Sequence, residues 1–357
     1  MNEKELLENQ KRVVEIMNKM AKNPQEAAEQ LLALQKDVEA VLSPDSQEYC
    51  ISSMAVCEAY GDCMVRLKKV PDAEKSYQQM VNHAAKFFEF DREKNDYHLG
   101  AAYYKLGSFY RTLIGCNVLL PKPKEFTEPQ KKVFEVAEQC YKSAIGCTMQ
   151  NAKKGLLRYV EFHSVCLADL IVFHAAAGDY KTAILCGKDA VRLGKMVYEK
   201  KDDKAQAVRL ANFMNALAAV YMFSKEPQPA MESLEDAVYV LEEHEKEDET
   251  GIGAMLARYY ISLGSCYVAI EEEKHQAEEA YKKGLERMVA INDKTNNKMI
   301  DDVIQSYMFV ADYYAKEQKE FDAKSHYTWA MKLASDMWKV TKNPKYDNLV
   351  KHLQSKV

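Results

Sequence analysis

The sequence predicts an all-α fold in which helical hairpins stack into a solenoid, and three observations carry that prediction. The chain has 13 glycines and 9 prolines, 22 of 357 residues and about half their usual share, which favours long, uninterrupted helices. Apolar and small residues recur at helical spacing along most of the chain. The same arrangement of these residues returns every 46 or 47 residues. A unit of that length predicts two helices of about 18 to 22 residues, each roughly 30 Å long.

One position in the first helix of each unit sets the repeat length. The residues at this position are Gly61, Gly107, Ile171, Ala218, Gly264 and Ala311. The steps between them are 46, 64, 47, 46 and 47 residues. The long step becomes 46 when 18 residues are subtracted from 64, which places an 18-residue insert near 117–134. We therefore expect one domain over 1–357, with six repeats over 46–340.

The last repeat gives the template most clearly. Its small and large residues stand at relative positions 4, 7, 8, 11, 20, 24 and 27, namely Tyr307, Val310, Ala311, Tyr314, Ala323, Tyr327 and Ala330. Small residues at 8, 20 and 27 let two helices approach closely, and large residues at 4, 7, 11 and 24 fill the space between them. This spacing resembles the tetratricopeptide repeat pattern, although the period exceeds the 34 residues of its commonest form.

The other elements follow in chain order. Residues 1–45 form an expected amino-terminal capping hairpin, whose second helix starts with Asn23 as a cap and Pro24 in the first turn. Repeats one and two keep tyrosine at the large positions, and the second helix of repeat two comes late because of the insert. Thr127 and Gln130 resemble a capping box at the start of that helix.

Repeats three to six and the carboxyl end complete the series. In repeat three, Gly178 is expected to end one helix and Asp179 to cap the next. Repeat four fits the template closely, and the second-helix set of repeat five is displaced by one residue. Residues 341–357 are expected to form a carboxyl-terminal cap, because Leu349, Val350 and Leu353 share one helical face.

The resemblance to the tetratricopeptide superfamily implies a right-handed superhelix of about seven hairpins that binds proteins or peptides in its concave groove. Among its members, the chain is most similar to long-helix forms such as the kinesin light chains and the peptide-sensing regulators of Gram-positive bacteria. A non-enzymatic scaffold or adaptor is the first function that this implies. The alternative is a peptide-responsive regulator similar to the pheromone receptors of those bacteria, but without a DNA-binding domain, for which residues 1–45 leave no room.

Charge and apolar patterning exclude several classes of partner. The formal net charge is −5 without a long basic run, so nucleic acid is a poor candidate partner. The first 22 residues lack the apolar core of a signal peptide, and the longest apolar stretch, 216–223, is too short to cross a bilayer. The nine cysteines contain no C-x-x-C pair, which favours reduced thiols and a cytoplasmic location. We expect no membrane partner.

No catalytic or cofactor motif occurs in the sequence. The metalloprotease, nucleophile-elbow, dinucleotide and phosphate-loop patterns are all missing. His163 and Cys166 share a predicted helix face, but two ligands do not close a tetrahedral metal site, and buried cysteine is common in helical cores. We therefore expect no metal, no cofactor and no enzymatic activity.

The candidate binding residues come from the resemblance, which implies that positions 2, 5 and 9 of each first helix line the concave groove. In repeats four to six the predicted peptide-binding residues are Asn212, Asn215, Arg258, Gln305 and Asp312. In the first helices of repeats two and three they are Tyr104, Arg158 and Glu161. An asparagine amide offers one donor and one acceptor to a peptide unit, and arginine suits a carboxylate.

Two features of the sequence, the asparagine pair and the insert, can each be interpreted in two ways. Asn212 and Asn215 are either backbone clamps for an extended ligand or ordinary exposed polar residues. The proline- and lysine-containing insert, expected as a loop over 117–128 outside the stacked core, is either a lid or a tolerated surface insertion.

Overall fold

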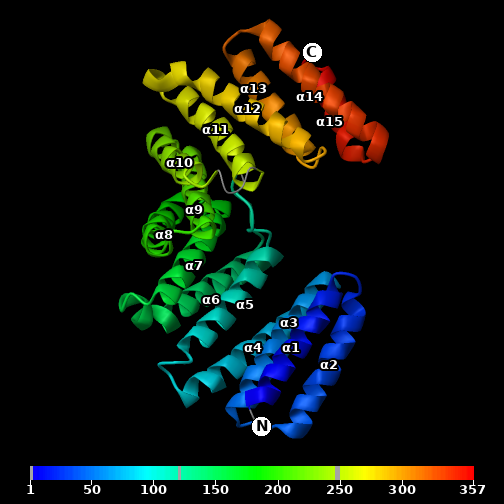
Figure 1. The fold of residues 1–357 in the computed structure, drawn as a ribbon, viewed down its shortest axis with the longest axis vertical. Coiled ribbons are helices and arrows are strands. Elements are labelled where there is room, and N and C mark those ends of the chain that lie inside the picture. The colour runs from blue at the N-terminus through cyan, green and yellow to red at the C-terminus, as the bar shows by residue number, and fades with distance from the viewer. Residues whose placement is uncertain (1–2, 120–121, 246–249) are drawn as a thin grey trace. The chain divides into compact units, whose positions relative to one another are not determined.

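The computed structural model describes residues 3–119, 122–245 and 250–357, and all regular secondary structure in these ranges is helical (Figure 1). A short 3₁₀ segment, η2 (Glu271–Gln276), precedes α12. The α-helices are α1 (Glu3–Met20), α2 (Pro24–Val41), α3 (Gln47–Arg66), α4 (Val70–Phe90), α5 (Asp96–Leu113), α6 (Glu128–Lys153), α7 (Leu157–Ala176), α8 (Tyr180–Lys201), α9 (Lys204–Phe223), α10 (Pro227–Glu242), α11 (Gly251–Ala269), α12 (Ala277–Lys294), α13 (Ile300–Lys316), α14 (Glu320–Thr341) and α15 (Pro344–Gln354).

The chain divides into two compact units, residues 1–179 and 180–357, called unit 1 and unit 2 below. Unit 1 contains α1 to α7 and unit 2 contains α8 to α15. The boundary lies in the turn of the third predicted repeat. A single continuous superhelix over both units stays a prediction.

Consecutive helices pack as hairpins inside each unit. In unit 1, α1 packs on α2, α3 on α4 and α5 on α6, and α7 packs on α6. In unit 2, the pairs are α9 with α10, α11 with α12 and α13 with α14, while α8 packs on α9 and α15 on α14. The predicted all-α, hairpin-based repeat fold is therefore confirmed.

The small residue at position 8 has a steric cause that the structure makes visible. A Cβ atom added to Gly61 would lie 2.6 Å from Cε1 of Tyr77, and one added to Gly264 would lie 2.8 Å from the Tyr281 ring. In both hairpins the tyrosine of position 24 covers the glycine of position 8. The two helices can approach this closely only because the first presents a bare backbone.

The predicted caps at Asn23 and Thr127 are present. The Asn23 side chain accepts a hydrogen bond from the Glu26 backbone N–H at 3.2 Å, and the Thr127 backbone N–H donates to Gln130 Oε1 at 3.0 Å. Gly178 has φ +81° and follows the end of α7, where the Asp179 backbone N–H donates to the His174 carbonyl at 3.0 Å. A cap of α8 by Asp179 stays a prediction. The one-residue displacement in repeat five coincides with η2, which occupies the turn before α12.

The insert is partly a loop, as predicted, but it is not separate from the packed helices. Its described residues before Glu128 have no helical structure, and residues 120 and 121 lie outside the described ranges. The Lys124 backbone N–H donates to the Ala176 carbonyl at 2.8 Å, and Pro123 lies against Gly178. In the second turn of α6, Phe134 stacks on Phe173 of α7 at 3.9 Å between ring centroids. The expectation of a loop outside the stacked core is wrong, because these residues cover the end of α7.

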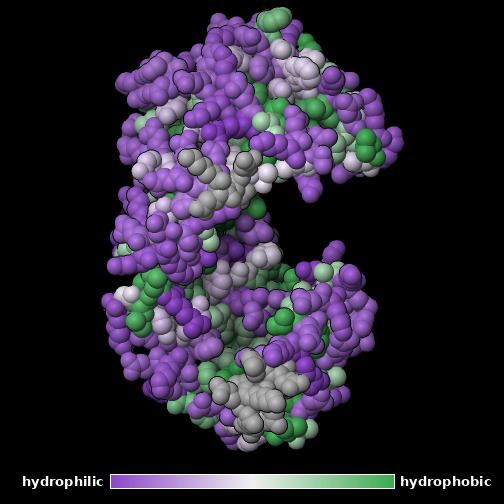
Figure 2. Space-filling model, in the orientation of Figure 1, coloured by the Kyte–Doolittle hydropathy of each residue, from purple (hydrophilic) through white to green (hydrophobic). Residues whose placement is uncertain are grey.

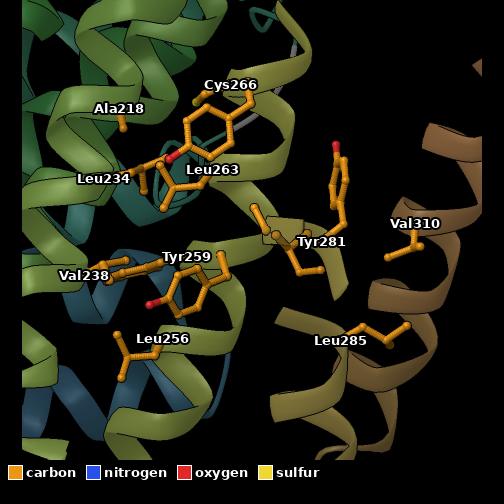
Figure 3. Packing of buried hydrophobic residues seen from close by; sticks show 14 of the residues in the cluster. Ala218, Leu234, Val238, Leu256, Tyr259, Leu263, Cys266, Tyr281, Leu285 and Val310 are labelled. Atoms are coloured by element: carbon orange, nitrogen blue, oxygen red, sulfur yellow. The ribbon is translucent and has the colours of Figure 1, made fainter. Parts of the chain in front are cut away.

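Unit 2 has one extended apolar core. Figure 3 shows how Leu234 and Val238 of α10 face Leu256, Tyr259 and Leu263 of α11, and all five belong to the same buried cluster. The cluster continues through α13 and α14 to the last helix. Tyr346 and Leu353 of α15 are buried in it, so α15 covers the final hairpin.

Unit 1 contains one helix, α7, that resembles a membrane-spanning segment in its sequence. α7 is long and apolar enough to cross a membrane by length and composition, but 61% of its apolar window is buried inside the protein. Its neighbours are the helices of its own unit, so it is a core helix. On the surface shown in Figure 2, hydrophilic residues predominate and hydrophobic ones gather in small patches.

The cysteines are free thiols, and most of them are buried. Seven of the nine have buried side chains, and Cys147 and Cys186 are half-buried. Burial raises the pKa of the Cys57 and Cys140 thiols to about 11 and that of Cys266 to about 12. They act as small apolar core residues rather than as nucleophiles.

Candidate peptide-binding groove

Two asparagines stand on the predicted inner face of α9. Asn212 is exposed, and its Oδ1 accepts a hydrogen bond from the Tyr259 hydroxyl of α11 at 3.2 Å. Asn215 is half-buried, and its side chain makes no hydrogen bond to any described residue. Ala219 follows one turn later and leaves the surface open beside the amide. The Asn215 amide therefore has both its donor and its acceptor available.

The next two first helices are joined by an ion pair. Arg258 of α11 places its Nε 2.9 Å from Oδ1 of Asp302 on α13, and the two side chains are 48% and 34% exposed. Gln305 lies one turn after Asp302, is exposed, and makes no side-chain hydrogen bond within the described ranges. Asp302 is not among the predicted residues because it precedes the expected stripe of α13. A ligand carboxylate at Arg258 would compete with it.

Asp312, the predicted groove residue near the end of α13, is engaged by its own hairpin. Its carboxylate accepts a short hydrogen bond from the Tyr327 hydroxyl of α14. The same link between positions 9 and 24 recurs in other repeats, from Tyr77 to Asp62 and between Tyr281 and Ser265. The residue at position 9 thus joins the two helices of its hairpin by a hydrogen bond. A ligand contact by Asp312 stays a prediction.

In unit 1, Tyr104 belongs to a polar cluster that pattern reasoning did not find. Its hydroxyl donates to Oδ2 of Asp169 at 3.0 Å, and Tyr141 donates to the same oxygen at 3.2 Å. Arg111 Nη1 lies 2.9 Å from the other oxygen, with 13% of its side chain exposed. Burial and the Asp169 charge raise the pKa of Tyr104. The tyrosine is therefore a neutral donor already in use.

Arg158 and Glu161 lie in the first turns of α7. The Arg158 guanidinium covers the Tyr97 ring, with its central carbon 3.6 Å from the ring centroid. Glu161 is half-buried, and Arg158 remains exposed. The structure thus divides the eight predicted residues, with Tyr104, Arg158 and Glu161 in unit 1 and the other five in unit 2. Within unit 2, the hydrogen bond from Tyr259 links Asn212 of α9 to α11. The ion pair with Asp302 links Arg258 of α11 to α13, one turn before Gln305.

Groups that could hold a metal are missing from the part of the chain that the structure describes, where no three His, Cys, Asp or Glu side chains converge. Nε2 of His163, which pattern reasoning had paired with Cys166, lies 2.7 Å from Thr148 Oγ1. Burial lowers the pKa of His163 and raises that of Cys166. Both residues serve the packing of α6 and α7.

Comparison with known proteins supports the fold. No protein-family model matches the sequence, and no curated protein matches it either. Among solved structures, the apo form of RapI is 10% identical with a TM-score of 0.53, covering 93% of this chain and 99% of its own. Aspartyl phosphate phosphatase F from Bacillus subtilis is 11% identical with a TM-score of 0.51, covering 98% and 79%. BtubC from P. vanneervenii is 16% identical with a TM-score of 0.50, covering 81% and 92%.

These likenesses concern the fold, since all three identities are far below the level at which function carries over. They agree with the 46- to 47-residue spacing, the small residues at position 8 and the observed hairpins. The chain is an all-α helical-repeat protein whose fold is similar to those of RapI, aspartyl phosphate phosphatase F and BtubC.

Proposed function

We propose that the chain is a protein- or peptide-binding module, and that α9, α11 and α13 of unit 2 hold an extended peptide segment. The observation that carries the proposal is the half-buried Asn215 amide, which has no partner among the described residues. A single amide can satisfy both the N–H and the C=O of one peptide unit. Asn212 and Gln305 extend the same surface with two further exposed amides.

Arg258 supplies the charge of this proposed site. Its guanidinium is held toward α13 by Asp302, and about half of the side chain remains exposed. Its remaining N–H groups suit a carboxylate, from an acidic side chain or from the end of the peptide. The Tyr104, Arg158 and Glu161 surface of unit 1 is a separate candidate contact area of the same kind.

The proposal covers a passive adaptor first and a peptide-responsive regulator second. The free thiols support a reducing, cytoplasmic setting for either role. We assign no reaction to the chain. Small-angle scattering with and without bound peptide separates the two roles, since a regulator changes conformation on binding and an adaptor does not.

The proposal is tested by capturing partners from the cytoplasm of the source cells and identifying them by mass spectrometry. The bound segment is then titrated by calorimetry into the wild type, Asn215→Ala and Arg258→Ala. Removing the Asn215 amide leaves a desolvated peptide group unpaired, at roughly 1–3 kcal/mol, which weakens binding about 5- to 150-fold.

The matched control is Asn82→Ala, which removes an exposed amide from α4, a second helix of its hairpin. It should leave the affinity for the peptide unchanged. All three variants should have the melting temperature of the wild type because they remove no core contact. Affinity that is unaltered in both Asn215→Ala and Arg258→Ala would place the binding surface elsewhere on the chain.

A further inference from the structure

The last helix of unit 2 does more than cover the final hairpin. Together α13 and α15 enclose a pocket of about 520 Å³, a size typical of sites that bury ligands. Ile304 and Met308 of α13 and Leu349 of α15 provide its apolar lining. Ile304 is buried, whereas Met308 and Leu349 are half-buried and pack on the core below.

The charged groups around this pocket are already paired with one another. Lys345 Nζ lies 2.9 Å from one oxygen of Asp301, whose other oxygen accepts the Tyr346 hydroxyl at 2.9 Å. Asp302 is held by Arg258 at 2.9 Å. The two carboxylates and the lysine that line the pocket therefore each have a partner of opposite charge.

Three further polar side chains remain at the rim. Gln305 of α13 and Asn348 and His352 of α15 are exposed, and their side chains make no hydrogen bond to any described residue. The two amides lie on opposite sides of the apolar lining, one on each helix. Amides in this position can bind the peptide units that flank a side chain inserted between them.

We infer that this pocket receives one large apolar side chain, of the size of leucine, methionine or phenylalanine, from the extended peptide. This inference rests on the proposed function and specifies what the peptide must contain. Inside the pocket an acidic side chain would meet Asp301 and Asp302, and a basic one would meet Lys345, and each of these three groups already has a partner of opposite charge, so either side chain would lose hydration without gaining a free counter-charge. An apolar side chain keeps both ion pairs intact and gains the contact with Met308 and Leu349.

The test uses phage-displayed random dodecapeptides as the probe. They are selected on the full chain and sequenced, and the enriched peptides are titrated into variants. Met308→Glu puts a third carboxylate beside Asp301 and Asp302, inside the pocket. Its matched control is Phe309→Glu, which adds the same charge at the neighbouring, exposed position that does not line the pocket.

We expect the selected peptides to share one large apolar position. Met308→Glu should weaken their binding at least tenfold, and Phe309→Glu should change it less than twofold. Asn348→Ala, at an exposed position of α15 that lines the pocket and is not part of the proposed groove, should weaken binding several-fold. Circular dichroism melts check that every variant is folded, and Asn348→Ala keeps the test decisive should Met308→Glu unfold.

The outcomes separate this inference from the proposal beneath it. Peptides that depend on Asn215 but lack an apolar position, and that tolerate Met308→Glu and Asn348→Ala, would overturn the pocket while leaving the groove. Selection that yields no peptide dependent on Asn215 would overturn the groove, and the pocket with it.

Discussion

Both units consist of packed helical hairpins, but their interiors differ in the number of buried polar side chains. Unit 1 holds ten of the buried polar side chains found among the described residues: Ser52, Ser53, Ser76, Asn95, Asp96, Thr148, Asn151, His163, Ser164 and His174. Unit 2 holds three, namely Gln206, Asn292 and Ser306, and most of its buried apolar residues belong to one large cluster. An apolar interior tolerates substitutions because any well-shaped contact stabilises it. In a polar interior, each buried polar side chain requires its hydrogen-bond partner. The comparison predicts that unit 1 is the more easily broken.

The largest effect is expected at Asp96, which is 4% exposed and accepts hydrogen bonds from Asn151 and Tyr159, both at 2.8 Å. Asp96→Ala leaves these two donors unpaired in the interior and should cost about 3 kcal/mol. The loss should be confined to unit 1. Hydrogen exchange followed by mass spectrometry should show faster exchange in α5 to α7 and unchanged exchange in α11 to α14.

Asp301 is the matched position in unit 2. It also accepts a tyrosine hydroxyl, from Tyr346 at 2.9 Å, but about half of its side chain is exposed. Asp301→Ala should therefore cost less than about 1 kcal/mol. A loss at Asp301 as large as that at Asp96 would contradict the contrast between the interiors.

A smaller effect is expected from mild acid, through the buried histidines of unit 1. Burial lowers the pKa of His163 and His174, which are both 5% exposed, below the ordinary value of 6.5. The unfolded chain then binds protons that the folded chain does not, so stability is present above about pH 6.5 and is lost as the pH falls below it. Glu138 and Asp179 face His174 and oppose this shift without reversing its direction.

Urea titrations at pH 7.5, 6.5 and 5.5 should show unit 1 weakening while unit 2 does not. His174→Gln should flatten part of that dependence, and His275→Gln, at an exposed position on unit 2, should keep the wild-type profile. A pH dependence equal in both units would show that the buried histidines do not set it.

The smallest effect concerns an ion-pair network on unit 2. Hydrogen bonds from Lys282 and Lys319, at 2.7 Å each, lower the pKa of Glu278 from 4.5 to about 2. Its contribution is present above pH 4.5 and is lost as the pH falls toward 2, a window below that of the histidines. Because about a third of the carboxylate side chain is exposed, Glu278→Gln should cost only about 0.2–1 kcal/mol.

Thermal melts at pH 6 and pH 3 measure this difference. The control is Glu279→Gln, which changes the neighbouring exposed carboxylate that forms no ion pair within the described ranges. The two variants should differ at pH 6 and converge at pH 3. A difference that persists at pH 3 would mean that Glu278 acts through packing rather than through its charge.

The repeat template, the capping turns at Asn23, Thr127 and Gly178, and the all-α class were predictable because each depends on residues within one repeat. The Asp169 cluster was not, since Arg111 lies 58 residues away and the insert shifts the register between them. The two compact units meet after Asp179, and apolar periodicity does not mark this point because it describes the face of one helix and not how many neighbours the helix has. One domain over 1–357 stays a prediction. The binding residues remain predictions, and the structure adds Asp302 and the α15 residues to them.

The buried cysteines make it possible to measure the opening of each unit on the unmodified chain. Six buried thiols lie in unit 1, namely Cys50, Cys57, Cys63, Cys116, Cys140 and Cys166, and one, Cys266, lies in unit 2. A thiol in the core reacts with an alkylating reagent only while its surroundings are open, since the raised pKa and the packing both withhold the thiolate. Pulsed alkylation followed by peptide mass mapping therefore times the opening of each unit separately, with no foreign label and no substitution.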